Sequence, residues 1–271
     1  MPMLERIAGN RELKQDLKTA LGSGRIAHSI LLVGEPGCGA GFAARCLAAD
    51  YLYPNGGPHA EAVLRGQDTE SIVVRGEGAS GQIKVEAIRD ARQNIQKSAL
   101  SSDAEGRVLF IYGAQNLNGA SANAMLKIME EPPEGVMFLL TASSAAAVLP
   151  TIRSRCISFA VAPVSPEECA QWCIGQGVDK KQARLYSELF DGHIGTVLAA
   201  ARDDARREQV EKALTLAKAA AAHDSYAAAV LLAGYEKDKA AAAALLGDFR
   251  AVAAAGLRGL RRTGRNHLRC R

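Results

Sequence analysis

Short apolar runs alternate with longer segments of helical periodicity over residues 1–160. The apolar runs are bounded by glycine, proline or polar residues, which is typical of strands buried on both faces of a parallel sheet. Five strands are predicted, at residues 28–33, 71–74, 107–112, 136–140 and 156–159. Helices are predicted between them, at residues 10–22, 41–49, 83–97 and 119–130. The alternation predicts an α/β fold with a parallel sheet that helices cover on both faces.

Beyond Pro163 and Pro166 the pattern contains only helices. Three helices are predicted at residues 166–175, 180–190 and 194–203, and an Ala-rich helical region begins at about residue 205. The chain is therefore expected to contain an α/β domain over residues 1–163, a small helical domain over 164–205 and an all-α segment over 206–271. Residues 53–70 are rich in glycine and proline and are predicted to be mostly loop.

A glycine-rich segment, Gly34-Glu-Pro-Gly-Cys-Gly-Ala-Gly41, follows the first predicted strand and precedes a helix. A phosphate-binding loop has glycine, four residues, glycine, lysine, and then serine or threonine. Gly34 and Gly39 stand at the glycine positions and Gly37 adds a flexible point, but Ala40 replaces the lysine and Gly41 the hydroxyl residue. Because no ammonium meets the phosphates and no hydroxyl ligates Mg²⁺, no productive Mg-ATP site is expected. A weak phosphate interaction with backbone N–H groups stays open.

Net charge over the 271 residues is +4, which is too small to indicate nucleic-acid binding by itself. Six arginines lie near the end of the chain: Arg258, Arg261, Arg262, Arg265, Arg269 and Arg271. These arginines form either a solvated tail or a patch that faces phosphate or a partner.

The six cysteines include no pair with C-x₂-C spacing, so a structural zinc site is not predicted. Cys169 and Cys173 are four residues apart on a predicted helix and are expected to be two buried thiols. The start of the chain lacks the apolar core of a signal peptide, and no run is expected to be apolar enough over ~18 residues to cross a membrane. We therefore expect a cytoplasmic protein with six free thiols and no membrane partner.

Three segments resemble a known family. Residues 28–39 are similar to the "HA-LF-GP-G-G" stretch of clamp-loader proteins, residues 123–133 to their "NALLK-EEPP" stretch, and residues 149–156 to their "TIRSRC" stretch. Together they resemble bacterial DNA polymerase III clamp-loader subunits of the AAA+ superfamily over residues 1–205. The resemblance implies a P-loop AAA+ domain over residues 1–163, a lid domain over 164–205 and a collar over 206–271. This collar is short for the family, either reduced or truncated.

The resemblance also indicates which kind of subunit this is. The family's ATPase subunits end the third strand in Asp-Glu, where this chain has Tyr112 and Gly113, and they carry a lid arginine where this chain has Gly195. Since Ala40 and Gly41 also replace the lysine and the serine or threonine of the loop, the pattern resembles the delta-prime subunits, which lack ATPase activity. Two alternatives stay open: an active gamma/tau-like ATPase and a stand-alone DNA-binding module.

Arg155, in the Ser-Arg-Cys stretch, is the predicted catalytic residue. In this family that arginine reaches a neighbouring subunit's ATP, and a planar guanidinium can pair with phosphate oxygens through two hydrogen bonds. The alternative is a surface salt bridge made by Arg153 or Arg155. Glu130 and Glu131 precede Pro-Pro at a helix end, and we expect them to have a packing or interface partner rather than a catalytic role.

The resemblance implies further contacts. The partners would be the ATPase subunits (gamma/tau), the delta subunit, primer–template DNA within the complex and possibly the sliding clamp. A DNA-facing role is implied for four residues of one predicted helix: Lys84, Arg89, Arg92 and Lys97. A merely solvated helix face is the alternative. The family's four-cysteine zinc module is not expected, because residues 47–70 contain no cysteine.

Overall fold

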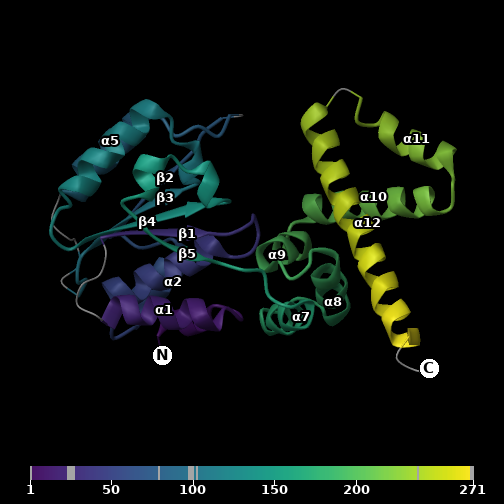
Figure 1. The fold of residues 1–271 in the computed structure, drawn as a ribbon, viewed down its shortest axis with the longest axis horizontal. Helices are drawn as coiled ribbons and strands as arrows, with labels where there is room; N and C mark the ends of the chain where they lie inside the picture. Colours follow the sequence, from purple (N-terminus) through teal and green to yellow (C-terminus); the bar gives the residue numbers. More distant parts are fainter. Residues whose placement is uncertain are drawn as a thin grey trace. The chain divides into compact units, whose positions relative to one another are not determined.

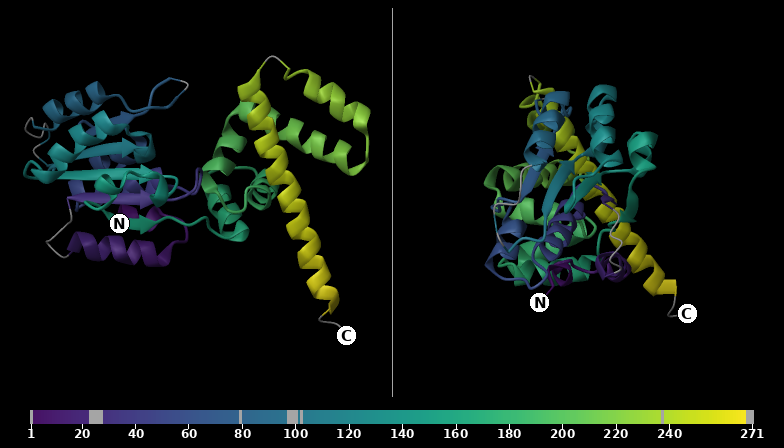
Figure 2. Two further views of the ribbon diagram at one scale, coloured as in Figure 1. Left: turned by 45° about the horizontal axis from the view of Figure 1, so that its top comes forward. Right: turned by 90° about the vertical axis from the view of Figure 1, so that its left-hand side faces the viewer.

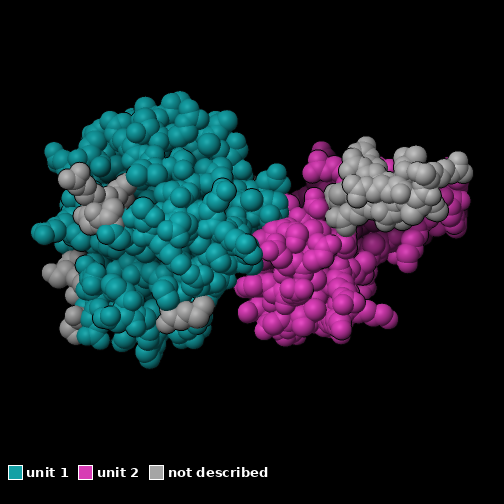
Figure 3. Space-filling view, turned by 60° about the horizontal axis from the view of Figure 1, so that its bottom comes forward, with its two compact units in different colours: residues 1–163 teal, residues 164–271 magenta. Residues whose placement is uncertain are grey.

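The computed structural model describes residues 2–22, 28–78, 80–96, 101, 103–236 and 238–268, with side chains as far as Leu257. The chain divides into two compact units, residues 1–163 and residues 164–271 (Figure 3). The first unit holds every named strand, and the second is entirely helical.

A five-stranded parallel sheet forms the centre of the first unit (Figure 1). Its strands are β1 (Ser29–Val33), β2 (Ser71–Arg75), β3 (Arg107–Tyr112), β4 (Val136–Ala142) and β5 (Ile157–Ala160). Their order is β2-β3-β4-β1-β5, and all the pairings are parallel. The five predicted strands and the α/β class are confirmed.

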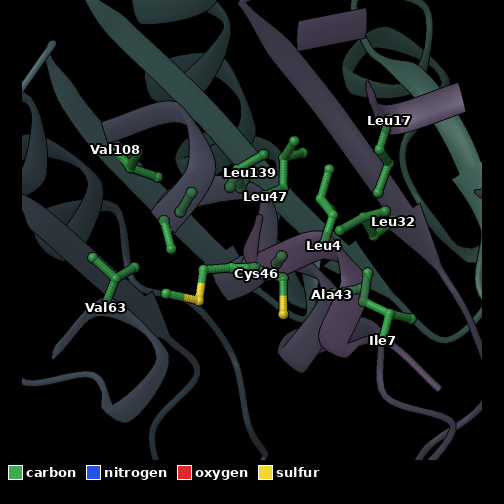
Figure 4. Packing of buried hydrophobic residues seen from close by; sticks show 14 of the residues in the cluster. Leu4, Ile7, Leu17, Leu32, Ala43, Cys46, Leu47, Val63, Val108 and Leu139 are labelled. Carbon is green, nitrogen blue, oxygen red and sulfur yellow. The ribbon is translucent and has the colours of Figure 1, made fainter. Parts of the chain in front are cut away.

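Helices cover both faces of this sheet (Figures 1 and 2). The helices of the unit are α1 (Arg11–Gly22), α2 (Ala40–Leu52), α3 (Pro58–Arg65), α4 (Val85–Ile95), α5 (Gly119–Glu130) and α6 (Pro150–Arg153). Alternate strand residues point to opposite faces. Leu32, Val108 and Leu139 therefore pack with α1, α2 and α3 (Figure 4), whereas Leu109 and Phe138 pack with α4, α5 and α6.

Helix α3 corrects the prediction of a loop over residues 53–70. Pro58 occupies the first turn, where its missing N–H and fixed φ suit a helix, and Gly66 ends the helix in the left-handed conformation with φ +67°. Ala60, Val63 and Leu64 form the buried face. The glycine and proline residues thus mark the two ends of a short helix rather than a continuous loop.

The second unit contains six helices in its described part. They are α7 (Pro166–Gly175), α8 (Lys180–Leu189), α9 (Ile194–Arg202), α10 (Asp204–Ala221), α11 (Ser225–Ala233) and α12 (Lys239–Leu268). Helix α12 packs along α10, where Leu245 is buried against Ala213 and Leu216. The two terminal guanidinium nitrogens of Arg206 on α10, Nη1 and Nη2, donate hydrogen bonds to the buried Asp248 carboxylate on α12. A further boundary near residue 205, between lid and collar, stays a prediction.

Over Lys239–Leu257, α12 has the length and apolar composition of a membrane-crossing helix, contrary to the expectation from the sequence. One such helix is weak support for a membrane segment. Alanine is its commonest residue, and the same stretch carries Asp248, which is ion-paired with Arg206. The helix packs along α10 through Leu245, although only 11% of this stretch is buried.

Candidate functional site

The glycine-rich loop lies between β1 and α2. The Gly34 N–H donates to the Ala142 carbonyl of β4 at 3.0 Å, and a Cβ at Gly34 would lie 2.4 Å from Cys38 Sγ. Gly37 and Gly39 have φ values of +89° and +103°, in the region that favours glycine. Helix α2 begins at Ala40, immediately after Gly39. The backbone of the loop is therefore built around glycine at the positions that the sequence pattern requires.

The side chain of Tyr112 lies beside this loop. A Cβ added at Gly41 would lie 3.2 Å from Tyr112 Cε1, so the ring stands against the position of the missing hydroxyl residue. Tyr112 ends β3, where the family resemblance places an acidic residue in ATPases. Its hydroxyl accepts a hydrogen bond from Arg45 Nε at 3.2 Å. Ala40 and Gly41 thus stand at the start of α2 with an aromatic ring beside them.

Arg155 and Glu130 lie together, although they are 25 residues apart in sequence. Arg155 Nη2 lies 2.6 Å from Glu130 Oε1, and Arg155 Nη1 donates to the Thr151 carbonyl at 3.1 Å. Their side chains are 39% and 51% exposed. Arg153 instead donates to the Ala145 carbonyl. The pair joins the "TIRSRC" and "EEPP" stretches at one exposed place. Both residues stand out in the sequence, but nothing in the sequence links them.

The basic residues of α4 divide into two groups. Lys84 precedes the helix and forms an exposed ion pair with Glu77 at 3.2 Å. Arg89 and Arg92 line a cavity of about 310 Å³ between α4 and α5. Lys97 lies outside the described residues. The opposite wall of the cavity comes from α5 and includes Lys127, which sequence reasoning missed although it stands in the "NALLK" stretch.

The described cysteines, Cys38, Cys46, Cys156, Cys169 and Cys173, are free, and Cys270 and the side chains of the arginines from Arg258 onward lie outside the described part. Burial raises the pKa of the Cys156 thiol, next to Arg155, to about 12. Cys169 and Cys173 are both buried, as predicted, and the hydrogen bond with Cys173 lowers the pKa of Cys169 to about 7. Among the described residues, no group of three or more His, Cys, Asp or Glu side chains is placed to hold a metal ion.

A parallel sheet between two helical layers, with a glycine loop joining β1 to α2, defines an α/β protein whose sheet is covered on both faces. A solved structure of a RuvB mutant from Thermotoga maritima shares this fold, with a TM-score of 0.50, 17% identity, and coverage of 87% of this chain and 72% of that chain. Residues 9–165 match the family described as DNA polymerase III, delta subunit, so the chain belongs to that family.

The relatives include proteins named for two different subunits. The DNA polymerase III subunit gamma of Buchnera aphidicola subsp. Acyrthosiphon pisum is 29% identical over 69% of this chain and 54% of its own length. The subunit delta' of Bacillus subtilis is 26% identical over 71% of this chain and 59% of its own length. The subunit delta' of Yersinia pestis is 34% identical over 41% of this chain and 32% of its own length. The chain thus spans between about a third and three fifths of these relatives.

Proposed function

We propose that this chain is a noncatalytic, delta-prime-type subunit of a DNA polymerase III clamp loader, which helps to place the sliding clamp on primed DNA. The observation that carries the proposal is the glycine loop with Ala40, Gly41 and the Tyr112 ring where an ATPase needs charged and hydroxyl groups. Such a loop supports a structural role for this domain, with ATP bound and hydrolysed in neighbouring gamma/tau subunits.

In this proposal Arg155 acts in trans as an arginine finger. The Arg155–Glu130 pair is exposed on both sides, and exposed ion pairs contribute only about 0–1 kcal/mol. Breaking the pair with the Glu130 carboxylate so that Arg155 can pair with a neighbour's phosphate therefore requires little free energy. A guanidinium paired with phosphate forms strong, directed hydrogen bonds. Glu130 would pair with the guanidinium until the neighbouring nucleotide arrives. The test is reconstitution with the ATPase subunits, the clamp and primed DNA, comparing wild type with Arg155→Ala.

The second unit supports the proposed association with gamma/tau and delta subunits. Several large apolar side chains of α11 and α12 are exposed: Tyr226, Val230, Leu232, Leu246 and Leu257. A cavity of about 710 Å³ with mainly apolar walls runs between α10 and α12, past Leu214, Phe249 and Val252. Apolar surface of this kind marks interaction sites. We propose that residues 206–271 join a collar formed with the other subunits.

The cavity between α4 and α5 is the proposed contact with primer–template DNA. Three positive charges line this cavity, which we call the α4–α5 groove: Arg89, Arg92 and Lys127. Phosphate contacts position a protein on DNA without reading its sequence. Lys84 contributes less, because Glu77 already pairs with it.

Replacing Arg89, Arg92 and Lys127 together with alanine is expected to reduce the salt dependence of DNA binding by the assembled complex. The slope of log K against log salt is negative, and each lost phosphate contact should reduce its magnitude by about 0.9. Fluorescence anisotropy of labelled primer–template DNA across a salt series measures this slope. The matched control replaces three exposed basic residues of α8, Lys180, Lys181 and Arg184, with alanine. Equal slopes for both triple variants would remove the groove from the DNA interface.

A further inference from the structure

Three arginines from three different elements surround a pocket on the sheet face that carries α2 and α3. Arg45 comes from α2, Arg65 from the end of α3 and Arg75 from the end of the edge strand β2. The pocket has a volume of about 300 Å³, and Tyr112 forms part of its wall. It lies on the opposite face of the sheet from the α4–α5 groove, since α2 and α3 pack on one face and α4 and α5 on the other.

Two of these guanidinium groups are held by the same tyrosine. Arg45 is half-buried, and it donates from Nε to the Tyr112 hydroxyl at 3.2 Å and from Nη1 to the Leu64 carbonyl at 3.1 Å. Arg75 Cζ lies 4.7 Å from the centre of the Tyr112 ring, in a cation–π contact. The two positive charges are therefore fixed near one another by side-chain contacts rather than left to move in solvent.

The positive charge of this pocket is only partly offset by its surroundings. Within the described residues no carboxylate forms an ion pair with Arg45, Arg65 or Arg75, and Arg65 donates to the amide oxygen of Gln67. Asp68 is the one acidic residue in the described lining, and its Oδ1 accepts hydrogen bonds from two backbone N–H groups, at 3.1 and 2.7 Å. Three like charges gathered in a concave site repel one another and attract an anion.

We propose that this pocket binds a small ligand with two or more linked phosphate groups. Planar guanidinium groups pair with phosphate oxygens through parallel hydrogen bonds, and three of them suit a phosphate chain better than a single carboxylate. The volume is at the lower end for small-molecule sites, which fits a phosphate chain. The Tyr112 ring already contacts Phe110 and Arg75, so the phosphate chain rather than an aromatic base supplies the recognition. The described lining of the pocket contains no residue of the glycine loop, and the site does not depend on the clamp-loader role.

The proposal is tested by titrating the full-length chain with inorganic pyrophosphate in an isothermal calorimeter at low ionic strength. We expect one saturable site, and Arg75→Gln should weaken pyrophosphate binding by about tenfold or more, as for the loss of a charged hydrogen-bonding partner. Arg75 is exposed, so this variant should fold normally, whereas Arg45→Gln also removes the contact to Leu64 and serves as a second variant. Arg184→Gln on α8 removes the same charge from an exposed position elsewhere and should leave binding unchanged.

Parallel titrations with ATP and with a short oligonucleotide distinguish the sources of the phosphate. ATP binding that Arg75→Gln weakens as much as pyrophosphate binding supports recognition of the phosphate chain wherever it comes from. Three results would overturn the proposal: no saturable pyrophosphate binding, equal weakening by Arg184→Gln and Arg75→Gln, or an oligonucleotide that binds this pocket more tightly than pyrophosphate does.

Discussion

Replacing Arg155 with alanine is expected to slow ATP hydrolysis at the neighbouring site of the assembled complex by roughly 10³–10⁵-fold, the range for arginine fingers supplied in trans to well-studied GTPases. The guanidinium would stabilise charge that develops on the phosphate oxygens in the transition state, and alanine offers no substitute. ATP affinity should change much less, because the contact is strongest in the transition state. The rate at the affected site is measured by single-turnover hydrolysis in the reconstituted complex. Steady-state turnover is less suitable, because it averages this rate with the rates of the other ATP sites.

Two control variants separate this effect from a structural one. Glu130→Gln breaks the Arg155–Glu130 ion pair but keeps the guanidinium, so hydrolysis should stay within a few-fold of wild type. Arg155→Lys keeps the charge without the planar fork and should recover only part of the rate. Two results would show that Arg155 forms only a surface salt bridge. One is a wild-type rate of hydrolysis with Arg155→Ala, and the other is an equal loss of rate with Glu130→Gln.

The second large effect concerns the sheet that supports both the loop and Arg155. We expect Phe138→Ala to lower the free energy of unfolding of the α/β unit by about 3–5 kcal/mol. Phe138 is fully buried on β4, which pairs with β1 on one side and β3 on the other. Removing its ring leaves a cavity beneath α4 and α5 that the surrounding strands cannot close.

Urea denaturation followed by far-UV circular dichroism measures this loss, while the fluorescence of Trp172 on α7 follows the helical unit separately. Ile157→Ala on the edge strand β5 is the control. Its side chain is 50% exposed, so removing it should cost only about 1 kcal/mol. A loss below 1 kcal/mol for Phe138→Ala would contradict the packing described for this face.

The strands were predictable because their apolar runs are continuous, as burial on both faces of a parallel sheet requires. Helix α3 was not predicted, because glycine and proline mark helix ends as well as loops, and Pro58 and Gly66 are eight residues apart. The sequence also gave no sign that Asp50 would accept the Met3 and Leu4 N–H groups and so fix the first turn of the chain onto α2. That contact joins residues about 47 apart and has no local signature.

The sequence pattern was enough to propose members of the candidate site, but not how they are arranged. The loop pattern and the resemblance pointed to Gly39 and Arg155, yet the pairing of Arg155 with Glu130 depends on where α5 ends in space. The position of Tyr112 against Gly41 depends on how closely β3 approaches the start of α2. In the sequence Tyr112 is only a residue that replaces a carboxylate, whereas in the structure its ring fills space beside the loop.

This chain's own loop is expected not to hydrolyse ATP, and turnover by the purified chain alone tests this most directly. We predict no Mg²⁺-dependent release of phosphate from ATP above the background of a preparation freed of other ATPases. Mg²⁺-dependent hydrolysis that stays with the chain through successive purification steps would contradict the account and would make this protein an ATPase in its own right.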